Sequence, residues 1–272
     1  MAAHTKVAVV SGGNKGIGLA IVRKLCKDFE GDVYLTARNE QRGKEAVSML
    51  QSEGLKPKFH QLDITSGESI EALKQEMTQK YGGVDVLVNN AGMAYKMAST
   101  APFIEQATNT LKTNFNGTLN ISRAFIPIMQ PHGRIVNVSS SAGHLRIVQK
   151  HLQEKFSNPN LTEVELVTLM DQFVKDVADG KHKERGWPNT AYGVSKVGMT
   201  ALTKIHAREV AKLEGKDILV NACCPGWVRT DMAGYNASLS PDEGAETPVF
   251  LALLPPSSPN GEFWKNKTVV QW

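Results

Sequence analysis

The chain has 272 residues, of which 41% are apolar and 21% are charged, a composition that can bury a sizeable core and argues against intrinsic disorder. The net charge of +4 is too small to indicate a nucleic-acid-binding protein, and it suits a modestly basic pocket for an anionic small molecule. No apolar run approaches the roughly 18 residues of a membrane-spanning helix, so we expect no membrane protein.

The three cysteines indicate a reducing compartment. Cys223 and Cys224 are adjacent and Cys26 is far from both in sequence, which excludes a disulfide framework. The chain has no Cys-x-x-Cys pair, and we expect no metal site. Its first residues lack the layout of a signal peptide, which leads us to expect a cytoplasmic protein.

Short apolar runs alternate with segments of helical periodicity along the chain. The expected strands are 7–10, 32–37, 58–62, 84–88, 134–138 and 218–223, and the expected helices are 17–28, 41–52, 69–81, 107–129 and 191–213. This alternation predicts an α/β fold, a single Rossmann-type, doubly wound parallel sheet with helices on both faces, as one domain over residues 1–272. Sites in such sheets lie at the carboxyl ends of the strands.

The segment 144–186 is too long for an ordinary loop and is expected to be a helical insertion within the domain. Thr162 and Glu165 form a capping-box pair, and an apolar stripe then predicts a helix over about 163–178 that stops at Gly180. The stripe consists of Leu166, Leu169, Met170, Phe173, Val174 and Val177.

Three glycines follow the first strand and lead directly into a helix. Gly12, Gly16 and Gly18 would let the backbone turn tightly and approach a pyrophosphate at the helix N-terminus. An ordinary tight turn is the alternative, but the position at the first strand of an alternating chain favours a dinucleotide site. The loop residues expected to bind the cofactor are Gly12, Asn14, Lys15, Gly16, Ile17 and Gly18.

The end of the second strand predicts which dinucleotide binds. An NAD-preferring site usually has an acidic residue there, whereas this chain has Ala37 followed by Arg38. A guanidinium can bind a 2′-phosphate through paired charged hydrogen bonds, with Lys15 in reach of the same group. Arg38 as a solvated surface charge is the alternative, but the missing acid favours NADPH/NADP+.

Tyr192 and Lys196 lie one turn apart on the expected helix 191–213. A free phenol has a pKa of about 10, and a nearby ammonium would lower it, which would help the phenol to shuttle protons at neutral pH. Tyr192 would then protonate a carbonyl oxygen while a hydride reaches the carbon. The alternative is that Tyr192 and Lys196 are an exposed pair without function, which would be preferred if no other motif were expected beside them.

Other polar residues are expected at the same edge of the sheet. Ser139 and Ser140 follow a buried strand, where a hydroxyl could donate to a substrate carbonyl, although two serines can also simply form a turn there. The segment 89–92 closes the neighbouring strand with small and amide residues, and Asn114 lies on the next helix.

Together these motifs resemble the short-chain dehydrogenase/reductase family from about residue 7 to the end of the chain. The resemblance rests on Gly12, Gly16, Gly18, Asn89, Asn90, Ala91, Gly92, Asn114, Ser140, Tyr192, Lys196, Pro225 and Gly226. The stretches 13–22, 221–232 and 243–248, and the insertion itself, are similar to the monomeric NADPH-dependent carbonyl reductases of animals.

The resemblance implies specific roles. Tyr192 would be the acid/base, and Ser140 would orient the carbonyl. Lys196 would lower the pKa of Tyr192 and bind the nicotinamide ribose, and Asn114 would hold a water that links Lys196 to solvent. Further cofactor contacts would be Asp63, Ile64, Asn90, Ala91, Gly92, Pro225, Gly226, Val228, Arg229 and Thr230. The substrate would meet Ser140, Tyr192, Tyr95, Lys96, Met97, Trp187, Ala191, Trp227 and Cys224.

The expected activity is the NADPH-dependent reduction of aldehydes, ketones and quinones to alcohols or hydroquinones. The alternatives are a reductase dedicated to one endogenous steroid or prostaglandin-type carbonyl, and a non-catalytic NADP-binding scaffold, against which the intact catalytic set argues. Cys224 is a candidate neighbour of a site for glutathione or its adducts, although an inert buried thiol is the simpler interpretation.

Relatives in this family commonly pair through the helices expected here at 107–129 and 191–213. The inserted helix has an apolar face that must be buried, and it can fold back over the outer face of the helix 191–213. It would then cover the pairing surface and wall the substrate pocket near Trp187, whereas a solvated flap is the alternative. We therefore expect a monomer.

Overall fold

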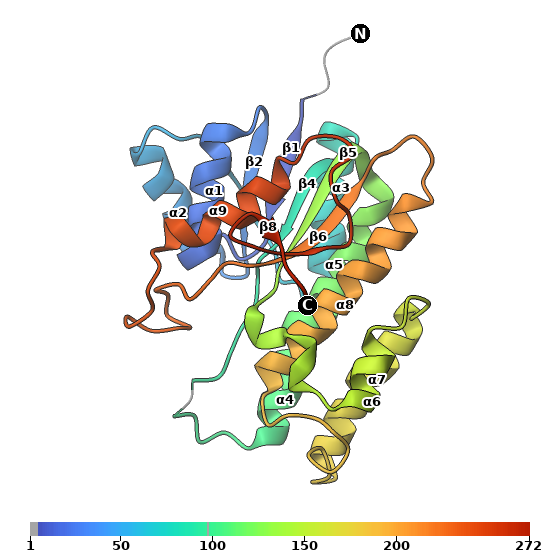
Figure 1. Ribbon diagram of the computed structural model, residues 1–272. Coiled ribbons are helices and arrows are strands. Elements are labelled where there is room, and N and C mark those ends of the chain that lie inside the picture. Colours follow the sequence, from blue (N-terminus) through green and yellow to red (C-terminus); the bar gives the residue numbers. More distant parts are fainter. Residues whose placement is uncertain (1–4, 97) are drawn as a thin grey trace.

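The computed structural model describes residues 5–96 and 98–272, which form one eight-stranded sheet with helices on both faces (Figure 1). The strand order is β3-β2-β1-β4-β5-β6-β7-β8, and every pairing is parallel except that of β7 with β8. This is the doubly wound Rossmann arrangement that the sequence predicts. The strands are β1 (Val7–Val10), β2 (Asp32–Ala37), β3 (Lys58–Gln61), β4 (Val84–Asn89), β5 (Met129–Val138), β6 (Leu219–Cys224), β7 (Phe263–Lys265) and β8 (Thr268–Val269).

Each face of the sheet has its own apolar core. One face packs against α1, α2 and α9, and the other packs against α3, α5 and the end of α8. A third core lies outside the sheet, among α4, α6, α7 and α8. The helices are α1 (Gly16–Asp28), α2 (Glu40–Ser52), α3 (Gly67–Tyr81), α4 (Phe103–Leu111), α5 (Thr118–Phe125), α6 (Lys150–Phe156), α7 (Glu163–Ala178), α8 (Ala191–Ala211) and α9 (Pro241–Ala252).

The prediction of one continuous helix over 107–129 is wrong. α4 already begins at Phe103, a π-helical segment at Lys112–Gly117 follows it, and α5 ends at Phe125. A short 3₁₀ turn at Ile126–Ile128 contains a proline, and β5 begins directly after it. The periodicity of the apolar residues continues across the π-helical segment, which is why the sequence gives no sign of the change.

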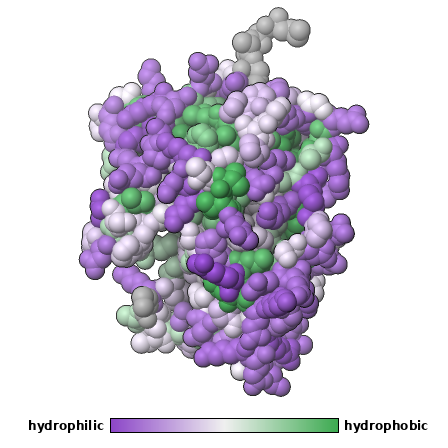
Figure 2. All heavy atoms as spheres, viewed as in Figure 1, coloured by the Kyte–Doolittle hydropathy of each residue, from purple (hydrophilic) through white to green (hydrophobic). Residues whose placement is uncertain are grey.

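The insertion folds back onto the body of the protein. α7 begins at the predicted capping box of Thr162 and Glu165, and its apolar face packs against α4 and α8. Glu163 joins the elements further, because its carboxylate lies 2.7 Å from Nε2 of His206 on α8 and 2.7 Å from Nη2 of Arg123 on α5. The predicted packing over α8 is confirmed, and the outer surface above α6 and α7 is mostly hydrophilic (Figure 2).

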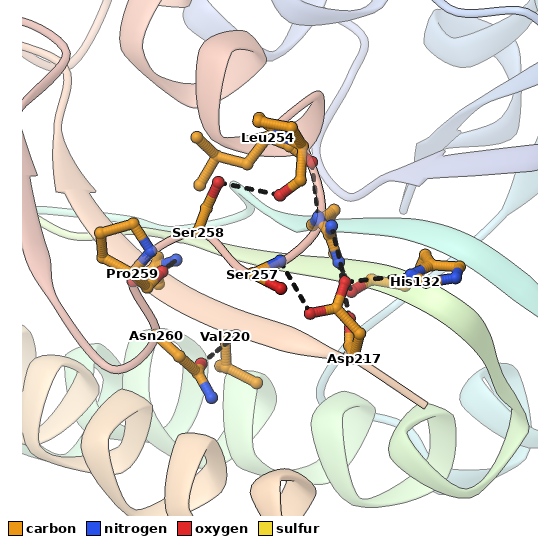
Figure 3. Close-up of polar contacts among 12 residues, drawn as sticks. His132, Asp217, Val220, Leu254, Ser257, Ser258, Pro259 and Asn260 are labelled. Carbon is orange, nitrogen blue, oxygen red and sulfur yellow. Dashed lines mark hydrogen bonds and ion pairs between the residues drawn. The ribbon is translucent and has the colours of Figure 1, made fainter. Parts of the chain in front are cut away.

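A polar network around His132, Asp217 and Leu254 lies at the opposite, amino-terminal edge of the sheet (Figure 3), and a buried arginine organises it. Arg134 is 4% exposed and donates to the carbonyls of Leu254 (2.9 Å) and Asp217 (2.8 Å). The Asp217 carboxylate also bonds Nδ1 of His132 at 3.0 Å and accepts from the amide of Ser257 at 3.0 Å. These bonds hold His132, Asp217 and Ser257 at φ values of 62°, 47° and 61°. The network fixes the turn before β6 and the chain after α9.

Candidate active site

The glycine loop between β1 and α1 closes tightly against the end of β4. Gly12 and Gly16 have φ values of 65° and 54°. A Cβ on Gly12 would lie 2.9 Å from the Cα of Ala91, and a Cβ on Gly18 would overlap the carbonyl oxygen of Gly12. A side chain is therefore excluded at Gly12 and Gly18, which lets the backbone there come close to a phosphate group at the N-terminus of α1.

Asn90 and Ser11 hold this loop in place. The side-chain amide of Asn90 donates to the carbonyls of Ser11 (3.0 Å) and Gly12 (3.1 Å). The Ser11 hydroxyl in turn accepts from the backbone amides of Asn90 and Ala91, both at 3.0 Å. Asn90, which the sequence suggested as a cofactor contact, thus also positions the loop. Ser11 was missed, although a serine directly before the glycines is a visible signal.

The segment after β6 covers the glycine loop. A Cβ on Gly16 would lie 3.1 Å from Cγ2 of Thr230, so the expected cofactor segment 225–230 is beside the loop. Lys15 Nζ lies 2.7 Å from Oδ2 of Asp231, and both side chains are exposed. This ion pair joins the two segments that we expect to enclose the cofactor.

The residues expected around the adenosine half lie at neighbouring strand ends. Arg38 is exposed directly after β2, while Ala37 before it is buried. Ile64 is buried beyond β3, and the Asp63 carboxylate accepts from the amide (2.9 Å) and the hydroxyl (2.7 Å) of Thr65. Strand β2 pairs with both β1 and β3, which brings these positions to the edge that carries the glycine loop.

Lys196 is buried beneath Tyr192 at the start of α8. The Lys196 side chain is 4% exposed, and its Nζ donates to the carbonyl of Val138 at 2.8 Å. The same ammonium lies 5.6 Å from the centroid of the Tyr192 ring. Burial lowers the pKa of Lys196 to about 8, because the charged form loses hydration.

The pKa of Tyr192 differs from the expectation. Burial raises it to about 12, a hydrogen bond with Ser140 opposes this shift, and the charge of a Cys224 thiolate would add to it. The expected lowering by Lys196 is thus not found among the groups that the chain itself supplies. The ammonium lies over the ring and bonds a backbone carbonyl, so it does not stabilise a phenolate oxygen directly. A phenol with this pKa is protonated at neutral pH and is therefore a proton donor.

The two serines after β5 face different partners. Ser139 is buried, and its hydroxyl bonds the Thr200 hydroxyl (2.8 Å) and the carbonyl of Lys196 (3.2 Å). The Ser140 hydroxyl accepts from the amide of Ala142 at 3.1 Å, and as a polar neighbour of the phenol it lowers the pKa of Tyr192. The structure therefore brings Ser140, the serine chosen from the sequence, to the phenol, and Ser139 anchors α8.

Asn114 lies in the π-helical segment and is fully buried. Its Oδ1 accepts from the amide of Met93 at 2.8 Å, and its Nδ2 donates to the Met93 carbonyl (2.9 Å) and to the Ser195 hydroxyl (3.1 Å). Single-turn π segments occur frequently at functional sites. Asn114 ties the loop after β4 to α8, one residue away from Lys196.

The residues expected to meet the substrate do not all lie together. Cys224 is buried, and its charge would act on both Tyr192 and Lys196, so it lies near them. Ala191 is also buried, whereas Trp227 and Lys96 are exposed. Met97 lies outside the described residues.

Trp187 and Tyr95 are turned toward other partners. Trp187 is 3% exposed, its ring packs on Phe173, and its Nε1 donates to Asp176 at 2.9 Å. It therefore belongs to the core of the insertion, and we correct the expectation that it walls the substrate pocket. The Tyr95 hydroxyl donates to Glu105 at 3.1 Å, which holds that side chain against α4.

Comparison with known proteins places these motifs in a family. The family model described as short chain dehydrogenase matches residues 6–151, and the model described as enoyl-(acyl carrier protein) reductase matches residues 180–247. The chain is 56% identical to carbonyl reductase (NADPH) 1 of Bos taurus and 55% identical to that of Homo sapiens, over the full length of both partners in each case. Among solved structures, salutaridine reductase from Papaver somniferum is 32% identical, with a TM-score of 0.87 over 95% of this chain and 99% of that chain.

Proposed function

The chain belongs to the short-chain dehydrogenase family, and we propose that it is an NADPH-dependent carbonyl reductase. The observation that carries this proposal is the convergence of Ser140, Tyr192 and Lys196 at the sheet edge that holds the glycine loop, with the Lys196 ammonium 5.6 Å from the centroid of the Tyr192 ring. Consumption of NADPH in the presence of a carbonyl panel that includes the quinone menadione tests it.

The chain fits the cofactor that this activity requires. Glycines at positions 12 and 16 carry no side chain where a pyrophosphate would bind, and Arg38 is exposed at the end of β2, where it could bind a 2′-phosphate. Lys196 would hold the nicotinamide ribose, and NADPH when bound supplies the hydride. The segment around Thr230 would close over it.

The chain's own groups account for the proton transfer. The Tyr192 phenol is protonated at neutral pH and can donate to a carbonyl oxygen, while the Ser140 hydroxyl orients that oxygen. After donation, the phenolate is stabilised by the same hydrogen bond, and Lys196 with Asn114 would return a proton from solvent.

The proposed substrates are apolar aldehydes, ketones and quinones. Trp227, Met232 and Tyr235 on the segment after β6 are 57%, 43% and 94% exposed, and exposed apolar side chains of this size commonly mark a binding surface. A reductase dedicated to one endogenous steroid or prostaglandin-type carbonyl is the second candidate. One carbonyl reduced far more efficiently than every other member of the panel would favour it.

Cofactor preference is expected to depend on Arg38. In the double variant with Ala37→Asp and Arg38→Ala, the preference for NADPH over NADH should fall about 10- to 100-fold, because charged hydrogen bonds are lost and a carboxylate repels the phosphate. Dissociation constants of both cofactors, measured by fluorescence titration, check this. Arg42→Ala removes another exposed positive charge, from α2, and should leave the preference intact. An unchanged preference in the double variant would make Arg38 a surface charge.

We propose that the protein is a monomer. α7 packs on α8 and α4, where relatives of this family pair, and Glu163 bonds both His206 and Arg123 there. The outward surface of the insertion is hydrophilic in Figure 2, which does not favour a further partner. Sedimentation equilibrium at micromolar concentration is expected to give a mass near 29.7 kDa. A dimer mass would show that another surface pairs.

Glutathione or its adducts are a further proposed ligand class, supported by the net charge of +4 and by the place of Cys224 beside Tyr192. Bound NADPH and glutathione together should slow the labelling of Cys224 by iodoacetamide, with Cys26 as an internal reference far from the site. Equal labelling rates of Cys224 with and without the ligands would contradict the proposed glutathione site.

A cytoplasmic location is proposed from the three cysteines, all of which are free thiols. Within the described residues, no helix has the length and apolar character needed to cross a bilayer.

A further inference from the structure

The segment after β8 returns to the carboxyl edge of the sheet and meets the turn behind Ser140. Trp272 Nε1 donates to the carbonyl oxygen of Gly143 at 2.7 Å, across 129 positions of sequence. The Trp272 ring packs against the small apolar cluster of Ala222, Cys224 and Phe263, and also against the core formed by α8 and the insertion. In Figure 1 the end of the chain, marked C, lies beside α8.

Gly143 is held on three sides. Its amide donates to the carbonyl of Ser140 at 2.9 Å, and its own carbonyl accepts from Trp272. A Cβ on Gly143 would lie 2.5 Å from the Cβ of Lys196, so the glycine backbone rests directly on α8. A displacement of Gly143 away from α8 would therefore move Ser140, whereas a displacement toward α8 is blocked by Lys196.

A second contact joins strand β7 to the turn that contains Gly143. The Phe263 ring of β7 meets the His144 ring edge-on, with the ring centroids 5.9 Å apart. His144 directly follows Gly143, so Phe263 of β7 and Trp272 beyond β8 contact two successive residues of the turn.

We propose that Trp272 is a positioning residue of the carbonyl site, which fixes the Ser140 turn through its hydrogen bond to Gly143. This role rests on the proposed function of that site. The Ser140 hydroxyl orients a carbonyl only at hydrogen-bonding distance and angle, and small misplacements of such a group cost rate. Trp272 thereby acts on turnover through Ser140 and leaves the glycine loop unaffected.

The test is the Trp272→Phe variant, which keeps an aromatic ring and removes the indole N–H. With menadione and NADPH, kcat should fall about 2- to 10-fold, the equivalent of one neutral hydrogen bond, while the dissociation constant of NADPH stays unchanged. Trp264→Phe is the matched control. Trp264 lies in β7, next to Phe263, and its indole also donates a hydrogen bond, to Asn221 at 3.2 Å. Unlike Trp272, it packs in the core on the α1 and α9 side of the sheet. Its replacement should leave kcat unchanged.

A double-mutant cycle tells positioning from general destabilisation. In a Ser140→Ala background, Trp272→Phe should cause no further loss of kcat, because the group that it positions is gone. An equal loss in both backgrounds, or an unchanged kcat in the single variant, would overturn the role of Trp272. A wild-type protein that reduces no carbonyl would instead contradict the proposed function itself, and this role with it.

Discussion

Replacing Tyr192 with phenylalanine is expected to lower kcat by about 10²- to 10⁴-fold, the usual contribution of a general acid. The phenol, with a pKa raised to about 12, is protonated at neutral pH and is the proposed proton donor, with the Ser140 hydroxyl as its neighbour. The phenylalanine ring would keep the packing over Lys196, so NADPH should bind almost as before. Steady-state rates with menadione and NADPH titrations by fluorescence measure the two effects separately.

The matched control for this variant is Tyr34→Phe. Tyr34 also carries a phenol with a hydrogen bond, to Glu76 of α3 at 2.9 Å, but it is buried in β2 outside the candidate site and should affect kcat little. A loss of less than tenfold in the Tyr192→Phe variant would mean that another group donates the proton.

Replacing Lys196 with methionine is expected to weaken NADPH binding about 10- to 100-fold, because a charged hydrogen-bond donor to the ribose is lost. The rate should fall as well, since Lys196 is also proposed to serve the return of the proton. Unlike the loss at Tyr192, this one should appear in both the dissociation constant of NADPH and kcat.

The same variant should be more stable than the wild type at neutral pH. The pKa of Lys196 is lowered to about 8 from 10.5, so the folded state binds fewer protons than the unfolded state between these values. Stability therefore rises with pH across this window, and the full penalty, on the order of 3 kcal/mol, is present below about pH 8.

Thermal unfolding at pH 7 and pH 10 checks the sign of the stability difference between the variant and the wild type. The Lys196→Met variant should gain most over the wild type at pH 7, and the gain should shrink at pH 10. A variant that is less stable at both pH values would show that the hydrogen bond to Val138 outweighs the cost of burying the charge. Activity that depends on the ammonium should decline in the wild type as the pH rises through about 8.

Much of the fold follows from local patterns in the sequence. Strands β1 and β2 and helix α7 lie at the predicted bounds, because buried parallel strands are continuous apolar runs and α7 begins with a capping box. Helix α9 was missed, although Ser240 and Glu243 form the same capping box, because Pro248 interrupts the pattern. Strands β7 and β8 are too short to give a periodic signal.

The candidate site is likewise only partly predictable from the sequence. The residues of the glycine loop, Ser140, Tyr192 and Lys196 stand out as motifs, and the structure brings them to one edge of the sheet. Contacts between segments far apart in the chain produce no recognisable sequence motif. The bond from Trp272 to Gly143 and the burial of Trp187 under α7 depend on how the end of the chain and the insertion pack, which local periodicity does not encode.

The most direct test of the proposed carbonyl reductase is NADPH consumption by the purified protein with a panel of aldehydes, ketones and quinones, menadione among them. The account predicts oxidation of NADPH that depends on the carbonyl, forms one alcohol or hydroquinone for each NADPH consumed, and is nearly lost in the Tyr192→Phe variant. Tight binding of NADPH without its consumption across the whole panel would contradict the account and indicate a non-catalytic NADP-binding scaffold.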